Sequence, residues 1–260
     1  MARAWIGTSG YAYDHWSGPF YPRDLPRRRW LDFYADRFAA VELNVTFYRL
    51  PDRSVFEAWA GQAPRPFRFV LKGSRYITHV KRLATGRHAV RTLFDRAEPL
   101  GRRLACVLWQ LPPRFGARPD RLAAFLRDLA SCEGARRTRH AFEFRDASWF
   151  TDSTYEVLRR AGAAIVISDS PFEVLAPGMR SRNLGRPVIR VPHTARFAYL
   201  RRHGPGSVHG SDYLEAMIRA DARWVKRWVA AGKDAFVFYN NDARGYAVEN
   251  AKRLRALVGR

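Results

Sequence analysis

The sequence has very few cysteines and no long hydrophobic run. Its two cysteines, Cys106 and Cys132, do not form a CxxC pair, so we expect neither a disulfide framework nor a zinc–thiolate site. No apolar run reaches the roughly 18 residues that a membrane-spanning helix needs, and the first residues lack the apolar core of a signal peptide. We therefore expect a folded, cytoplasmic protein that has no membrane partner.

Acidic residues are also scarce. The 260 residues include 24 Asp and Glu against 46 Lys and Arg, which gives a formal net charge of +22. Only five of the basic residues are lysine, and arginine binds phosphate and carboxylate through paired hydrogen bonds. The arginines are scattered, however, and net charge does not by itself localise a binding site. We expect an anionic small molecule as partner, with nucleic acid as an alternative and no protein partner implied.

Short apolar runs alternate with amphipathic segments along the whole chain. Residues 122–129 carry leucine and phenylalanine at helical spacing after Pro119, a residue favoured in the first turn of a helix, and similar patterns predict helices over 214–229 and 248–258. Runs rich in Val, Ile, Leu and Phe predict strands buried on both faces: Ala4–Ser9, Ala40–Asn44, Phe67–Lys72, Leu104–Leu111, His140–Arg145, Ala164–Asp169, Phe197–His203 and Asp234–Asn241.

Eight strands that alternate with helices predict an α/β fold, a single (β/α)8 TIM-like barrel that forms one domain over residues 1–260. Prolines and glycines interrupt the segment 170–196, so the sixth crossover is expected to be irregular.

Polar residues gather where the predicted strands end. Residues two apart project from the same face of a strand, and three strands carry such polar pairs: Glu42 and Asn44, Glu143 and Arg145, and Arg201 and His203. Because barrel active sites lie at the carboxyl ends of the strands, where burying charge is costly, we expect these residues to line one pocket. The alternative is a layer of salt bridges, such as Glu42 with Lys72 and Glu143 with Arg145.

This residue set favours a site for an anionic small molecule that works by acid/base chemistry without a cofactor. Cations would bind a phosphate or carboxylate, a glutamate would be the base, a histidine the acid, and amides would orient the substrate. The expected catalytic residues are Glu42, Glu143 and His203. The expected substrate-binding residues are Asn44, Lys72, His79, Gln110, Arg145, Trp149, Asp169, Arg201, Tyr239 and Asn240. A hydrolase, a lyase or an isomerase fits such a site, but the residues do not decide whether the protein is an enzyme.

Several strand ends also carry motifs of a known family. In order along nearly the whole chain, the motifs resemble those of the YecE-like family, domain of unknown function number 72: residues 7–11 (GTSGY), 41–48 (VELNVTFY), 72–79 (KGSRYITH), 108–113 (LWQLPP), 143–145 (EFR) with 148–149 (SW), and 238–242 (FYNND). The resemblance implies a TIM-barrel-like fold and no established reaction.

Two positions depart from the family pattern. Asp146-Ala147 stands where the family usually has His-Pro, a change that would alter a pocket rim. Arg202 occupies an ordinarily apolar place. We expect Arg202 to face the helices and to extend its guanidinium to solvent.

Two other enzyme classes use parts of the same residue set. By analogy of fold alone, a phosphodiesterase or endonuclease would bind a divalent metal through His79 and His203 with Glu42, Glu143 or Asp169, but no HxH or HExxH spacing favours such a site. A glycosidase needs two carboxylates and sugar-stacking rings. The seventh strand offers Arg201 and His203 where many glycosidases place a carboxylate, which counts against this class.

A nucleic-acid-binding barrel is the remaining alternative. Such a protein would use its basic rim for the phosphates and exposed aromatic rings for unpaired bases. The aromatic residues of the first loop are candidates for this stacking: Tyr11, Trp16, Phe20 and Tyr21.

Overall fold

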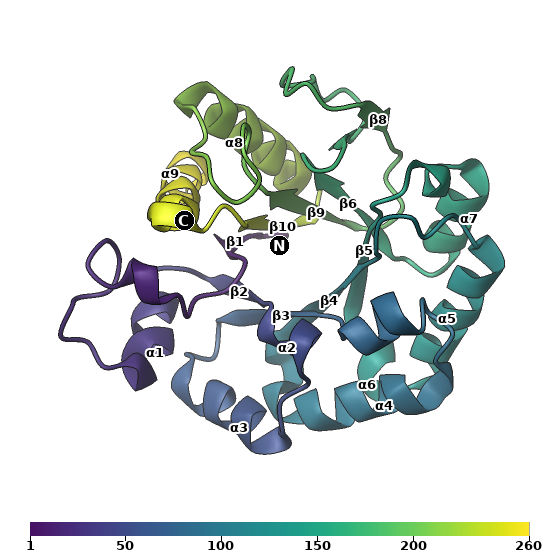
Figure 1. Ribbon diagram of the computed structural model, residues 1–260, viewed down its shortest axis with the longest axis horizontal. Coiled ribbons are helices and arrows are strands. Elements are labelled where there is room, and N and C mark those ends of the chain that lie inside the picture. The colour runs from purple at the N-terminus through teal and green to yellow at the C-terminus, as the bar shows by residue number, and fades with distance from the viewer. Residues whose placement is uncertain (260) are drawn as a thin grey trace. The chain divides into compact units, whose positions relative to one another are not determined.

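The computed structural model describes residues 1–259 and contains all eight predicted strands (Figure 1). Each begins and ends within two residues of its predicted bounds. Their apolar side chains are buried on both faces, as expected for strands between a core and a layer of helices. The strands are β1 (Ala4–Thr8), β2 (Ala40–Leu43), β3 (Arg68–Lys72), β4 (Leu104–Gln110), β5 (Arg139–Glu143), β6 (Ala164–Ser168), β9 (Phe197–Arg202) and β10 (Asp234–Tyr239).

The strands are hydrogen-bonded in the order β1-β10-β9-β6-β5-β4-β3-β2. The pairs β1–β10, β10–β9, β6–β9, β5–β6, β4–β5 and β3–β4 are parallel. An isolated parallel bridge also joins Ser9, just after β1, to Glu42 in β2. Parallel strands in this order, separated by helices, are the topology of a (β/α)8 barrel, so the α/β, TIM-like fold class is confirmed.

Helices connect the strands. The α-helices are α1 (Trp30–Ala35), α2 (Val45–Tyr48), α3 (Arg53–Gln62), α4 (Gly86–Ala97), α5 (Pro119–Ser131), α6 (Glu133–Arg136), α7 (Asp152–Arg160), α8 (Glu215–Ala230) and α9 (Tyr246–Val258). Shorter helical turns are η1 (Asp14–Trp16), η2 (Arg27–Arg29), η3 (Tyr76–Val80), η4 (Glu98–Arg103), η5 (Ala147–Trp149) and η6 (Ala243–Gly245). The three helices predicted from apolar spacing, α5, α8 and α9, are confirmed.

The first of two compact units comprises Met1–Glu42, Val166–Val191 and the chain from Arg196 onward. In it, Thr8 of β1 lies opposite Tyr239 of β10, and Tyr239 lies opposite Arg202 of β9. Helices α8 and α9 lie side by side, α8 against β10 and α9 against both β10 and β1 (Figure 1). This register brings the carboxyl ends of three strands to one edge of the unit.

The second unit comprises Leu43–Ile165 and Pro192–Ala195. Lys72 of β3 lies opposite Leu108 of β4, and Gln110 of β4 lies opposite Glu143 of β5. Helices α3, α4, α5 and α7 contact one another in chain order along these strands (Figure 1). In this unit too, the register places the polar ends of neighbouring strands at one edge.

The sixth crossover is irregular, as predicted, but it contains two strands that the sequence pattern does not reveal. β7 (Glu173–Leu175) pairs with β6 in the antiparallel direction, and β8 (Val188–Arg190) pairs with β7 in the parallel direction. Both have only three residues, too few for a hydrophobic period to be recognised.

Among residues 1–259, no helix combines the length and the hydropathy that crossing a bilayer requires. The assignment of residues 1–260 to one domain and the cytoplasmic location stay predictions.

Candidate functional site

Glu42 and Arg201 form the centre of a buried polar cluster in the first unit. Arg201 donates from Nε to Oε2 of Glu42 at 3.1 Å and from Nη2 to Oε1 at 2.7 Å. Tyr199 donates its hydroxyl to Oε2 at 2.5 Å, and the hydroxyl of Ser9 donates to Oε1. Both members of the ion pair are at most 1% exposed. We call Ser9, Glu42, Tyr199 and Arg201 the Glu42 cluster. The main role that these contacts give the Glu42 carboxylate is to neutralise and orient the guanidinium of Arg201.

His203 connects this cluster to Asp169 at the end of β6. Nη1 of Arg201 lies 3.1 Å from Nε2 of His203, and because a guanidinium only donates, Nε2 accepts and the ring proton belongs on Nδ1. Nδ1 lies 3.5 Å from Oδ1 of Asp169, which also accepts the backbone N–H of His203 at 2.9 Å. The chain of contacts from Asp169 through His203 and Arg201 to Glu42 fixes the histidine tautomer.

Asp169 is ionised although it is buried. Burial by itself raises its pKa, but the hydrogen bond from His203 and the charge of Arg202 outweigh burial and hold the pKa well below its usual range. The hydroxyl of Tyr213 donates to Oδ2, and burial together with the charge of Asp169 raises the pKa of Tyr213 well above 10.0. Tyr213 therefore stays protonated and serves as a donor to Asp169.

Arg202 is buried, so the prediction that its guanidinium reaches solvent is wrong. The residue does face a helix, as expected, but its side chain is 1% exposed and is paired with Asp221 of α8. Nε donates to Oδ2 at 3.0 Å and Nη2 donates to Oδ1 at 2.5 Å. Burial raises the pKa of Asp221, but the charges of Arg182 and Arg202 outweigh it and lower that pKa. A paired charge costs less in the interior than a lone one, which is why Arg202 need not extend outward.

Tyr239 and Asn240 lie at the end of β10. Tyr239 is fully buried, and its hydroxyl lies 3.5 Å from Oδ2 of Asp221. The backbone N–H of Asn240 donates to the carbonyl of Arg202 at 2.7 Å, and its own carbonyl accepts from His209. Tyr239 and Arg202 therefore project from the same face of the sheet, toward Asp221 of α8.

A second cluster occupies the strand ends of the second unit. Nζ of Lys72 lies 4.1 Å from the ring centre of Phe47, and that ring contacts the imidazole of His79 edge to face at 4.9 Å. Arg145 donates to Oε1 of Glu143 from Nε at 2.8 Å and contacts the same oxygen from Nη2 at 2.6 Å. We call Phe47, Lys72, His79, Glu143 and Arg145 the Lys72 cluster. The predicted pairing of Glu143 with Arg145 is present.

The imidazole of His79 lies in a positive field. Partial burial and the charges of Lys72, Arg75 and Arg145 lower its pKa from 6.5 to about 4. The hydroxyl of Thr78 lies 2.9 Å from Nδ1 and steadies the ring. His79 is therefore neutral at pH 7, surrounded by cations.

Three further predicted residues lie in the second unit. Trp149 is fully buried, donates from Nε1 to the carbonyl of Phe115 at 2.5 Å and stacks on Phe144 at 4.9 Å. Gln110 is partly buried at the end of β4. The side-chain oxygen of Asn44 is buried and has no hydrogen-bond partner among residues 1–259. The binding roles of these residues stay predictions.

The predicted residues thus fall into two groups that are each compact. Glu42, Asp169, Arg201 and His203 are linked in the first unit, and Lys72, His79, Glu143 and Arg145 lie in the second. Whether Glu42, Glu143 and His203 are catalytic stays a prediction.

Sequence reasoning missed several partners in these groups. The sequence did contain a signal for Tyr199. It precedes Arg201 by two residues and His203 by four, so the alternation of a strand places all three side chains on the same face. A signal was also present for Asp221. It lies on the apolar face of α8 between Ile218 and Val225, and a carboxylate buried on such a face requires a cation as its partner. Three further partners lie inside the family motifs, which was the available signal: Ser9, Phe47 and Arg75. No local pattern identifies Tyr213.

Metal binding has no preformed donor set in the described chain. No group of three or more His, Cys, Asp or Glu side chains within residues 1–259 is placed to hold an ion. The expectation of no resident cofactor stays a prediction.

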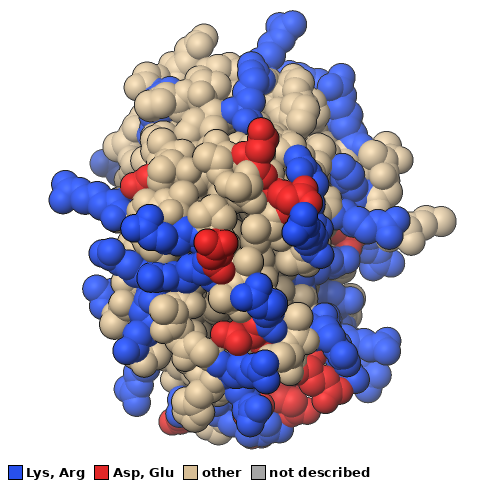
Figure 2. Space-filling model, turned by 90° about the vertical axis from the view of Figure 1, so that its right-hand side faces the viewer, with Lys and Arg blue, Asp and Glu red and all other residues tan. Residues whose placement is uncertain are grey.

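The nucleic-acid alternative is not favoured. Trp16 and Tyr21 are fully buried and Phe20 is 8% exposed. Tyr21 stacks on Trp30 at 4.4 Å, so these rings pack on one another and not on bases. Figure 2 shows Lys and Arg spread over one face with acidic and uncharged residues between them, without a single basic patch.

Comparisons with known proteins show similarity over nearly the full length. The model of the family described as "Protein of unknown function DUF72" matches residues 5–260. The UPF0759 protein YunF of Bacillus subtilis (strain 168) is 26% identical over 271 residues, which span 98% of this chain and 94% of the relative. Crystal structures of a DUF72 family protein from Thermotoga maritima MSB8 and one from Enterococcus faecalis V583 are also similar. The first has a TM-score of 0.78, 26% identity and coverage of 98% and 99% of the two chains. The second has a TM-score of 0.76, 20% identity and coverage of 99% and 95%.

Proposed function

The chain belongs to the DUF72 family, as its motifs predicted, and from this premise we propose that it binds a phosphate- or carboxylate-bearing small molecule at the Lys72 cluster. The reaction that fits this cluster is acid/base chemistry on the bound anion. The observation that carries the proposal is that Lys72 and His79 contact the same ring, that of Phe47, and that the charges of Lys72, Arg75 and Arg145 act on this half-buried imidazole.

The position of the cluster favours a ligand site. Lys72 ends β3, His79 lies in η3 just beyond it, and Arg145 follows the end of β5. These are carboxyl ends of strands, where TIM-barrel proteins bind their substrates. Lys72 is 9% exposed and Arg145 19% exposed, so an anion would meet both cations in a partly water-excluded place where attraction between charges is stronger than in water.

His79 is suited to hold a proton only when an anion is present. In the free protein, partial burial and then the surrounding cations keep the pKa of His79 at about 4. A bound phosphate would offset those cations and raise that pKa toward neutrality, so that His79 could accept a proton from the ligand and return it. Binding would thereby switch on the group that performs the chemistry.

Two neighbours position the cations. Glu143 is 1% exposed and holds the guanidinium of Arg145 by two contacts to one oxygen. Phe47 supports the ammonium of Lys72 on its ring face. The acid and base roles predicted for His203 and Glu42 belong to the Glu42 cluster and stay a separate prediction.

Calorimetric titration with inorganic phosphate and with acetate tests the proposal on the full chain. We expect Lys72→Met and Arg145→Met each to weaken phosphate binding about tenfold or more, the loss of one charged contact. The matched control is Arg127→Met, which removes an exposed arginine of α5. Equal affinity in the native protein and both cluster variants, or an equal loss in the control, would contradict the proposal.

A further inference from the structure

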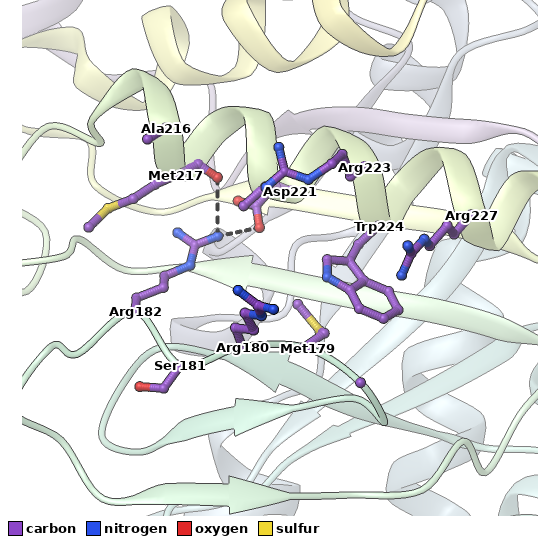
Figure 3. A pocket seen from close by; sticks show the side chains of 12 residues that line it. Met179, Arg180, Ser181, Arg182, Ala216, Met217, Asp221, Arg223, Trp224 and Arg227 are labelled. Atoms are coloured by element: carbon purple, nitrogen blue, oxygen red, sulfur yellow. Dashed lines mark hydrogen bonds and ion pairs between the residues drawn. The ribbon is translucent and has the colours of Figure 1, made fainter.

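A hollow of about 500 Å³ lies between α8 and the segment that follows β7 (Figure 3). Residues 178–182 line one side, and the other side is one face of α8, where Met217, Asp221 and Trp224 recur at helical spacing. The volume falls in the range of about 300–1,000 Å³ that is usual for small-molecule sites. None of the residues predicted to bind substrate lines it.

Arg182 is the buried cation of this hollow. Its side chain is 8% exposed, and its Nη2 is paired with Asp221 and lies 3.4 Å from the carbonyl of Met217 (Figure 3). Its Nη1 is buried and has no hydrogen-bond partner among residues 1–259. A buried donor without an acceptor is costly, so a ligand that supplies an acceptor oxygen would be stabilised here.

The backbone around Arg182 is held in place by Glu173 of β7. This carboxylate is buried and accepts the backbone N–H of Arg182 at 2.7 Å and that of Leu184 at 2.9 Å. The hydroxyl of Ser181 donates to the same carboxylate at 3.1 Å. These contacts fix the loop before any ligand arrives, which lowers the entropic cost of binding.

The hollow carries an excess of positive charge. Among the described residues that line it, Asp221 is the single carboxylate, and it is already paired with Arg202 of β9 as well as with Arg182. The other charged lining residues are exposed arginines: Arg180, Arg223 and Arg227. An anion is therefore the ligand that this charge distribution attracts.

The same hollow has an aromatic and apolar side. Trp224 is partly buried, with the guanidinium of Arg227 5.0 Å from its ring centre. Gly178 has a φ of +80°, and a Cβ there would lie 3.3 Å from Cη2 of Trp224, so glycine lets the loop pass close to the ring. Met179 and Met217 add adaptable apolar surface. A flat ring could pack against this side.

We propose that the hollow between α8 and residues 178–182 binds a small molecule that joins a phosphate to a flat ring, of the nucleoside monophosphate class. Arg182 and Arg180 bind the phosphate, and Trp224 packs against the ring. The site is independent of the Lys72 cluster.

Calorimetric titration of the full chain with AMP, adenosine and inorganic phosphate tests this site. We expect AMP to bind more tightly than either of its parts. Arg180→Ala should weaken AMP binding about tenfold or more. Trp224→Leu should weaken AMP binding while leaving phosphate binding within about twofold. The matched control is Lys226→Ala, which removes an exposed cation of α8 outside the hollow, and it should change AMP affinity less than twofold.

Three outcomes would overturn the proposal. AMP could bind no better than phosphate or adenosine, Lys226→Ala could weaken binding as much as Arg180→Ala, or AMP binding could depend on Lys72→Met and not on Arg180→Ala. The last outcome would place the ligand at the Lys72 cluster. Arg180 is exposed, so its replacement tests the site even if Trp224→Leu fails to fold.

Discussion

Arg201 and Glu42 lie 159 residues apart in the chain and are joined by two hydrogen bonds, of 2.7 and 3.1 Å, inside the first unit. Both side chains are removed from water, so each buried charge depends on the other for its stabilisation. Taking away one partner would leave the other charge buried and uncompensated.

Single replacements of this pair should therefore be more damaging than the double replacement. We expect Glu42→Met or Arg201→Met each to lower the free energy of unfolding by about 3–5 kcal/mol, and the double variant to lower it by less. Urea denaturation measures all three. The control is Arg219→Met, which breaks an exposed ion pair with Glu215 and should cost at most about 1 kcal/mol. A double variant that loses the sum of both single effects would refute this description.

Stability should fall in acid because of Asp169. Its folded-state pKa is depressed, since its hydrogen bond and neighbouring charges outweigh its burial. The stability it contributes is thus complete above the unfolded pKa of about 3.9 and is lost as the pH falls below that value. We expect Asp169→Asn to be less stable at pH 6 and to depend less on pH between about 2.5 and 4. Urea midpoints across this range check the prediction, with the exposed Asp24→Asn as the matched control.

His140 should make the stability of the folded protein depend on pH in a second range, above that of Asp169. Burial lowers its pKa from 6.5 to about 4, and the neutral ring accepts from Trp109 at 3.1 Å and contacts the carbonyl of Ala135 at 3.0 Å. A depressed pKa means that the contribution is present above 6.5 and is lost as the pH falls toward 4, on the order of 3 kcal/mol in total. Thermal melts of His140→Leu should show a flatter dependence in this window. An unchanged slope would mean that His140 is not the titrating group.

The positive electrostatic potential at the His79 imidazole should fall when one of the neighbouring cations is removed. We expect Lys72→Met to raise the pKa of His79 above its native value of about 4, because the second-largest cause of its depression is gone. Proton NMR of the imidazole during a pH titration measures this directly. If the pKa stays unchanged in the variant, the Lys72 ammonium does not act on His79.

Sequence pattern was sufficient for the main strands and for much of the candidate site. Short buried runs rich in β-branched residues, such as Ala164–Ser168, are typical of a strand in a sheet that is covered on both faces. Residues spaced two apart, such as Arg201 and His203, had to share a strand face, and they do contact each other at 3.1 Å. These features depend on local periodicity, which a single sequence carries.

Partners contributed by distant segments could not be predicted in this way. Arg202 looked like a surface residue because its counter-ion, Asp221, lies in a helix that follows it by 19 positions. Trp16 and Tyr21 looked like loop aromatics, but tertiary packing buries them. Short strands such as Glu173–Leu175 are defined by their neighbours and not by their own residues.

The most direct measurement is the pKa of His79 with and without saturating inorganic phosphate, followed by NMR on the full chain. An anion bound among Lys72, Arg75 and Arg145 should raise that pKa well above its value of about 4 in the free protein. Lys72→Met should require more phosphate to produce the same change. If phosphate leaves the titration of His79 unaltered, no anion binds at the Lys72 cluster and the proposed function is wrong.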